Sequence, residues 1–267
     1  MKRIVVVLCG VLLSLLLLGC NTDANYQQGR ELFLKGDYEQ AAKLLQKSGD
    51  KGAGLLGVLY YWGKGVEQSW SSARSSFSCA AGTKDRAAEI EDPIVWFYMG
   101  NMYLIGESES AIQDLTKSRI AHYDRFKAAL ECYEQARKMG YDKDDIDLRI
   151  GILRSMIETY DTDKLSCSSH RCAHSSTFYG RYDGYGKEGW GYTVGGNVNP
   201  RLQLFRLGHW AHNEIDSPCL EVAWVEDLYN SGEEHVFIQL NGVCYNSDGS
   251  KSPSCLLYTS DAADDLI

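Results

Sequence analysis

Apolar side chains follow two different spacings along the chain, and the change falls near Lys164. From Tyr26 to Tyr160 they recur every three to four positions, which is the period of an amphipathic α-helix. After Lys164, short apolar stretches alternate with polar residues and glycines, as in half-buried β-strands. These stretches cover residues 202–207, 220–225 and 235–245. The pattern predicts helices over residues 26–160 and a small β-rich domain over residues 165–254.

The first helical segment is interrupted at Gly36 and Asp37, with apolar residues at helical spacing on both sides. Glycine accepts the backbone conformation of a tight turn, and Ala41 is small enough to let two helices approach closely. The arrangement Gly-Asp-Tyr-x-x-Ala resembles a tetratricopeptide hairpin. We therefore expect a helix, a tight turn and a second helix here.

Residues 53–82 carry a more specific pattern of small and aromatic positions: Gly57, Tyr60, Gly63, Gly65, Ala73, Phe77, Ala80 and Gly82. This pattern resembles a Sel-one-like repeat, a relative of the tetratricopeptide family. In such a pair Gly57 lets the helices lie close together, Tyr60 fills the seam between them, and Gly63 and Gly65 form the turn.

A second copy follows, with an insertion at residues 107–124 between its two helices. Its positions are Gly100, Tyr103, Gly106, Ala129, Ala136 and Gly140. The insertion is either a protruding loop or an extra helix, and either contacts a partner or is a tolerated expansion. One more helix over residues 144–159 is expected to cap the array. The resemblance implies an α-helical repeat solenoid of αα-hairpins, whose concave surface binds other proteins.

Cysteines and histidines supply the candidate chemistry. Cys79 and Cys132, one in each repeat, are expected to be small buried residues, with a bridge between them as the alternative. Four residues have side chains of the types that bind zinc, and His209 and His212 follow downstream. The competing interpretation is a short disulfide from Cys167 to Cys172. A thiol hydrolase using Cys167 or Cys172 with His209 is the enzyme hypothesis. The four residues are Cys167, His170, Cys172 and His174.

Two further features belong to the β-rich region. Cys219 and Cys244 flank strands predicted to be adjacent, so they could form a disulfide there. Glycines and aromatic residues alternate from Tyr179 to Tyr192. This segment either stacks on sugar rings, as in a carbohydrate- or peptidoglycan-binding protein, or serves packing and turns.

The chain begins as an exported protein does, because Lys2 and Arg3 precede an apolar run over residues 4–18. The following Leu-Leu-Gly-Cys resembles a bacterial lipobox, which implies cleavage after residue 19 and acylation of Cys20. Two or three acyl chains give stable membrane attachment. We expect residues 20–25 to be a lipidated tether. Asn21 after the cysteine resembles lipoproteins of the Gram-negative outer membrane that face the periplasm.

Residues 255–267 resemble a translated sequencing adapter, so we expect the native protein to differ there and to continue past Ser254. The formal net charge of −9 leaves no broad basic surface and disfavours nucleic-acid binding. The sequence predicts no cofactor and no catalytic constellation in residues 26–160. We therefore expect a membrane-anchored envelope scaffold, with carbohydrate or peptidoglycan binding, or a metal- or thiol-dependent hydrolase, as alternatives.

Overall fold

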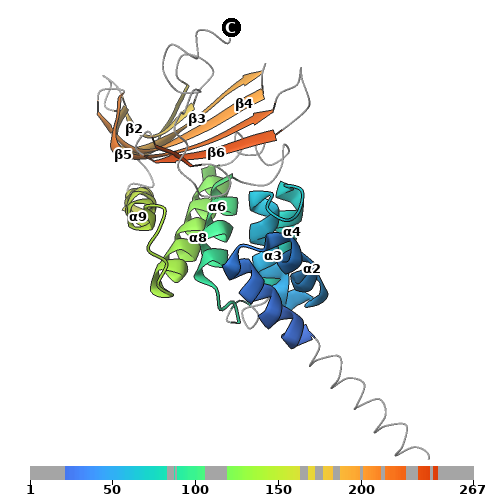
Figure 1. Ribbon diagram of the computed structural model, residues 1–267. Helices are drawn as coiled ribbons and strands as arrows, with labels where there is room; N and C mark the ends of the chain where they lie inside the picture. Colours follow the sequence, from blue (N-terminus) through green and yellow to red (C-terminus); the bar gives the residue numbers. More distant parts are fainter. Residues whose placement is uncertain are drawn as a thin grey trace, which may run out of the picture. The chain divides into compact units, whose positions relative to one another are not determined.

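The computed structural model describes residues 22–82, 87, 89–105, 119–162, 168–171, 177–182, 187–198, 201–211, 214–226, 234–240 and 243–245. The chain divides into two compact units, Met1–Tyr98 (unit 1) and Met99–Ile267 (unit 2), and the division falls inside helix α6 (Pro93–Ile105). Helices come first along the chain and an antiparallel sheet follows (Figure 1). The predicted order of helical and β segments is confirmed.

The predicted turn at Gly36 separates two helices of unit 1. Residues 22–35 form the first helix, and α2 spans Tyr38–Lys47. Gly36 has a φ of 83°, a value that residues with a side chain rarely adopt. The Asp37 carboxylate then caps α2 by accepting a hydrogen bond from the Gln40 N–H at 3.3 Å. Residues 22–25, which belong to the segment expected to be a lipidated tether, are already helical.

Helix α3 (Asp50–Trp62) is the central helix of unit 1 and packs on both α2 and α4 (Trp70–Ala81). Its residues 52–59 are all buried, and glycines among them allow close neighbours. A Cβ atom on Gly54 would lie 2.9 Å from a methyl carbon of Val95 in α6. Helix α3 is therefore surrounded by other helices rather than amphipathic.

Aromatic rings join the helices of unit 1 into one core. Phe33 of the first helix stacks on Trp62, with ring centroids 5.3 Å apart. Tyr98 of α6 meets Tyr61 at 4.7 Å and Trp62 at 5.6 Å, both edge to face. Edge-to-face and offset stacked pairs add stability beyond their buried area.

In unit 2, α8 (Arg119–Lys138) and α9 (Ile146–Thr162) pack against each other. Residues 119–124, predicted as part of the insertion, extend α8; residues 107–118 lie outside the described residues. Tyr133 of α8 donates a 2.6 Å hydrogen bond to the side-chain oxygen of Asn101 in α6. Arg149 of α9 donates to the same oxygen at 3.3 Å and is only 1% exposed. A buried polar network therefore connects the three helices.

The sheet of unit 2 is an antiparallel meander in which each strand pairs with the next along the chain. Alternate residues of its central strands, including Tyr192, Leu207 and Leu220, are buried on one face. The strands are β1 (Ser168–Arg171), β2 (Thr177–Tyr182), β3 (Lys187–Val198), β4 (Arg201–Ala211), β5 (Glu214–Glu226), β6 (Glu234–Leu240) and β7 (Val243–Tyr245).

Helix α9 confirms the helix predicted after the second repeat, but its expected role as a terminal cap is wrong. One side of α9 contacts α8, and it also contacts β3, β4 and β5. Figure 1 shows α9 running beneath the sheet. Phe126 of α8 adds an edge-to-face contact with Tyr192 of β3, with centroids 5.2 Å apart. The last helices and the sheet therefore share one core.

Candidate functional site

Gly57 and Gly100, two of the residues predicted to define the repeats, make the same kind of close helix contact in the two units. In unit 1, a Cβ on Gly57 would lie 2.8 Å from the ring of Phe77. In unit 2, a Cβ on Gly100 would lie 2.7 Å from the ring of Tyr133. Each ring is flanked in its own helix by small residues four positions before and three after, and all four are buried: Ala73, Ala80, Ala129 and Ala136.

The predicted seam tyrosines do not fill the seams. Tyr60 is half-buried, and Tyr103 is 42% exposed. The next residue in each helix is the buried one: Tyr61 is 3% and Leu104 is 2% exposed. One position along a helix rotates the side chain by roughly 100°, which is enough to move it from the seam to the rim.

Most of the predicted turn glycines have the backbone that the turn requires. Gly63, Gly65 and Gly140 have φ values of 69°, 71° and 95°. Gly82 follows the last residue of α4 with an ordinary helical φ of −53°, so its lack of a side chain is not needed there. Gly106 and the proposed acylation site Cys20 lie outside the described residues.

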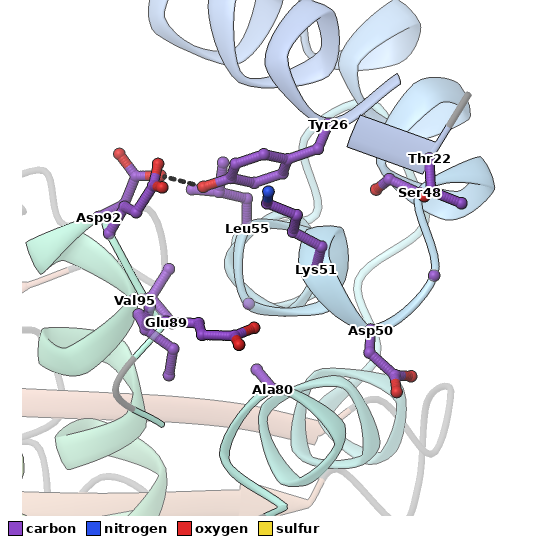
Figure 2. Close-up of a pocket in the computed structure, with 14 residues that line it drawn as sticks. Thr22, Tyr26, Ser48, Asp50, Lys51, Leu55, Ala80, Glu89, Asp92 and Val95 are labelled. Carbon is purple, nitrogen blue, oxygen red and sulfur yellow. Dashed lines mark hydrogen bonds between the residues drawn. The ribbon is translucent and has the colours of Figure 1, made fainter. Parts of the chain in front are cut away.

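A pocket of about 580 Å³ opens in unit 1 and is the candidate binding site of this unit. It is formed by the first helix, the start of α3, the side of α4 and the segment that leads into α6 (Figure 2). Its walls carry the methyl groups of Leu55, Ala80 and Val95, the ring of Tyr26, and several charged side chains. Pockets of this size typically accept small molecules.

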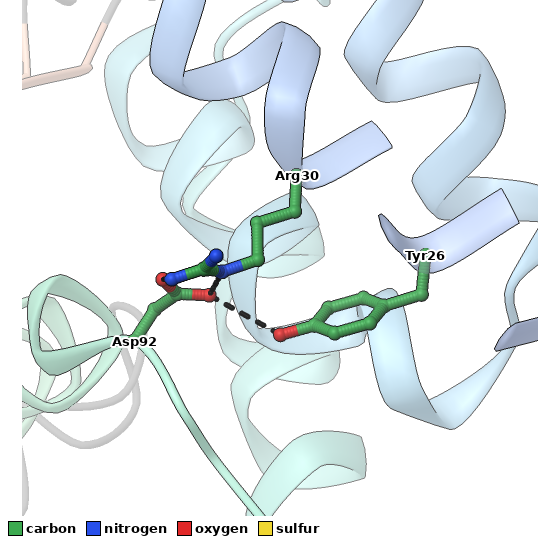
Figure 3. Close-up of polar contacts among 3 residues, drawn as sticks. All are labelled: Tyr26, Arg30 and Asp92. Atoms are coloured by element: carbon green, nitrogen blue, oxygen red, sulfur yellow. Dashed lines mark hydrogen bonds and ion pairs between the residues drawn. The ribbon is translucent and has the colours of Figure 1, made fainter. Parts of the chain in front are cut away.

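One wall of the pocket is fixed by three residues that are far apart in sequence (Figure 3). The Arg30 guanidinium contacts both carboxylate oxygens of Asp92, with Nε 2.8 and 2.9 Å from them and an Nη atom 2.7 Å from Oδ1. The Tyr26 hydroxyl donates to Asp92 Oδ2 at 3.2 Å. Burial, together with the charges of Asp92 and Glu91, raises the pKa of Tyr26. The ring of Tyr26 is thus held in place with its hydroxyl protonated.

Lys51 projects over this wall. Its ammonium lies 5.4 Å from the centroid of the Tyr26 ring and 2.8 Å from Asp23 Oδ1. The hydrogen bond to Asp23 raises the pKa of Lys51, and the charges of Glu91 and Glu89 act in the same direction. Aromatic faces and carboxylates both attract cations, so these residues stabilise a positive group.

The residues of this wall were not predicted as a site. Tyr26 and Arg30 are four positions apart and therefore share one face of the first helix. An arginine on a helix face that also carries buried residues requires an acidic partner, and this signal could have indicated a polar contact. The partner, Asp92, is 62 residues from Arg30, which no local pattern identifies.

The metal and thiol candidates are only partly within the described residues. Cys167, Cys172, His174 and His212 lie outside them, and no cluster of metal-ligating residues occurs within them. His170 lies in β1 opposite Phe178, and His209 lies in β4 opposite Trp190. Three strand spacings, about 14 Å along the sheet, separate β1 from β4, so the structure does not bring these histidines together.

Both disulfides that were considered outside the Cys167–Cys172 pair are wrong. Cys132 is a buried thiol outside any disulfide, which excludes the bridge to Cys79. The stretch predicted as one strand over 235–245 is two strands, β6 and β7. Cys244 therefore lies in β7, separated from Cys219 in β5 by the whole of β6. Two strand spacings of about 4.8 Å exceed the Cα separation that a disulfide allows.

The glycine- and aromatic-rich segment from Tyr179 to Tyr192 contributes to β2 and β3, which pair with each other. Tyr192 is 5% exposed and packs on Phe126 of α8. At this position the aromatic side chain serves the core of unit 2, which favours the packing interpretation over sugar stacking for this residue.

Comparison with known proteins adds no assignment to this geometry. Within the described residues, no helix combines the length and the apolar character needed to cross a bilayer. The chain matches no protein-family model, no curated protein and no solved structure.

Proposed function

We propose that this chain is an acylated protein of the bacterial cell envelope whose helical repeats bind another envelope protein. The observation that carries the proposal is the repeated helix contact, in which Gly57 meets Phe77 and Gly100 meets Tyr133. Repeats of this kind bury their apolar faces against one another and leave a surface for a guest. The Sel-one-like pattern in the sequence supports a solenoid arrangement of these pairs.

The pocket of unit 1 supplies a docking site on this scaffold. It combines apolar walls with carboxylates and a fixed tyrosine ring. Its charged lining, Asp50, Glu89, Glu91 and Lys51 with Asp92, contributes binding groups rather than an activated nucleophile. Binding, and not turnover, is the function that this lining favours.

Acylation at Cys20 is the second part of the proposal, and the Leu-Leu-Gly-Cys pattern supports it. Replacing Cys20→Ser should abolish incorporation of labelled palmitate and move the protein from the detergent phase to the aqueous phase. Cys9→Ser is the matched control, because Cys9 lies inside the apolar leader and should leave labelling intact. Palmitate retained in Cys20→Ser would contradict the anchor. Asn21 favours the outer membrane as the destination.

Site-specific photo-crosslinking in living cells tests the scaffold function. A photoreactive residue replacing Glu89 at the pocket should give one discrete adduct with an envelope protein. The same residue replacing Glu31, an exposed position outside the pocket lining, is the control and should give none. If no described position on the helices of unit 1 yields an adduct, the scaffold proposal fails.

A further inference from the structure

We infer that the pocket of unit 1 binds a lysine or arginine side chain from a basic segment of the partner protein. This inference rests on the proposed scaffold function and specifies the chemistry of its guest. Charge complementarity, an existing ammonium position and the size of the pocket each support it.

The pocket has an excess of acidic groups. Among the described residues that line it, Asp50, Glu89, Glu91 and Asp92 are acidic and Lys51 is the single cation. The charge of Asp92 is balanced by Arg30. Within the part of the chain that the structure describes, Glu89 and Glu91 make no hydrogen bond or ion pair, and both are exposed. Two carboxylates at the mouth of a pocket attract a cation and repel an anionic guest.

Lys51 marks the place where the cation of the guest would bind. Its ammonium lies over the Tyr26 ring and beside Asp23, at the distances of a cation–π contact and an ion pair. The Lys51 side chain is 36% exposed, so it can turn into solvent at little cost. A guest lysine or arginine would then take over the contact with Tyr26 while Glu89 and Glu91 supply the additional attraction.

The pocket is large enough for this exchange. At about 580 Å³ it exceeds what one side chain fills and leaves room for part of the peptide backbone. Leu55, Ala80 and Val95 form apolar walls against which the methylene stem of a lysine or arginine can pack. The same walls would gain nothing from a small hydrated cation.

The binding experiment uses the full acylated chain in detergent micelles and a fluorescein-labelled hexalysine peptide, followed by fluorescence anisotropy at low salt. Hexaglutamate with the same label is the control peptide. Hexalysine should bind and weaken as salt increases, whereas hexaglutamate should not bind. Equal binding of both peptides would overturn the inference.

Variants then assign the binding to the pocket. The double variant Glu89→Gln and Glu91→Gln should weaken hexalysine binding by about three- to tenfold, the effect of two partly exposed ion pairs. The double variant Glu31→Gln and Glu39→Gln removes the same charge from exposed positions that pair with Lys35 and Lys43, and it should bind as the original chain does. Equal loss in both double variants would show that only net charge matters and would overturn the inference.

Lys51→Met tests the role of Lys51, because a general effect of net charge would change hexalysine binding only weakly in this variant. Removing the competing ammonium should tighten hexalysine binding severalfold, and weaker binding would contradict the role of Lys51. Vesicles containing phosphatidylethanolamine form the last arm, because their headgroups also carry an ammonium. The chain could bind these vesicles but not hexalysine, and the Glu89→Gln and Glu91→Gln changes could abolish the vesicle binding. This result would overturn the inference of a peptide guest and identify a lipid headgroup as the guest instead. If hexalysine binding fails while crosslinking from Glu89 persists, this inference falls and the scaffold function stands.

Discussion

Gly57→Ala tests the close helix contact on which the proposed repeat depends. The added methyl carbon would lie 2.8 Å from two ring carbons of Phe77, about 0.7 to 1.2 Å inside an ordinary carbon–carbon contact. Phe77 is 4% exposed, so its ring has little room to move. Overpacking of this kind costs about 1 to 3 kcal/mol, and replacing glycine inside a helix recovers about 0.5 to 1 kcal/mol. We therefore expect a net loss of stability of about 0 to 2.5 kcal/mol.

The matched control is Gly151→Ala in α9. A Cβ on Gly151 meets nothing within 4 Å, so only the gain in helix propensity remains, and we expect about 0.5 to 1 kcal/mol of stabilisation. Both variants make the same chemical change in a helix, yet the free energy of unfolding should move in opposite directions. Urea titration followed by circular dichroism at 222 nm measures both.

A double variant isolates the contact itself. Phe77→Leu shortens the ring that the new methyl would meet, so Gly57→Ala should cost less in its presence, and the coupling should be at least about 0.5 kcal/mol. If Gly57→Ala stabilises the protein as Gly151→Ala does, Gly57 is an ordinary helical residue and the repeat assignment loses its physical basis.

Three other substitutions or reactions test separate parts of the structure. Gly65→Ala should lower the melting temperature more than Gly36→Ala does. Both glycines have a positive φ, but only at Gly65 would a Cβ lie 2.3 Å from a backbone atom, that of Tyr38. Equal melting temperatures would contradict this packing. Burial raises the pKa of Tyr133 to about 12, so the unfolded chain loses this proton first as the pH rises, and the free energy of unfolding should fall between pH 10 and 12. Tyr133→Phe should lose about 1 kcal/mol at neutral pH because its hydrogen bond is gone, but its stability should fall less between pH 10 and 12. An identical fall in both proteins would refute the assignment to Tyr133. Burial raises the pKa of Cys132 to about 12, so iodoacetamide at pH 8 should label this thiol only after denaturation. Peptide mass spectrometry measures the labelling, and a labelled Cys132 in the native chain would contradict its burial.

Local patterns predicted the helices and their turns well because the physical causes are local. Gly36 and Gly63 stand where the chain needs a positive φ, and a sequence displays that requirement directly. The spacing around Gly57 likewise identified the residues that meet across two neighbouring helices. The choice between Tyr60 and Tyr61 for the seam failed because adjacent aromatic residues give the same hydrophobic pattern.

Long-range partners could not be predicted in this way. The contact between Arg30 and Asp92 joins segments 62 residues apart, and the surrounding pocket depends on it. The placement of Cys244 failed for a related reason, because residues 234–240 and 243–245 form two paired strands, and β6 lies between Cys244 in β7 and Cys219 in β5. The contacts on the second side of α9 could not be predicted either, because they are made with strands that follow it in the sequence, β3, β4 and β5.

The first helix has begun by residue 22, so the linker between it and the membrane is very short if Cys20 carries the acyl chains. Two residues of fully extended chain reach about 7 Å, which is about the thickness of one lipid headgroup layer. Thr22 lines the pocket, so the pocket would open at the bilayer surface rather than deep in the periplasm. A guest anchored in the same membrane would then meet it by lateral diffusion at a high local concentration, and a weak contact with one side chain would suffice for capture.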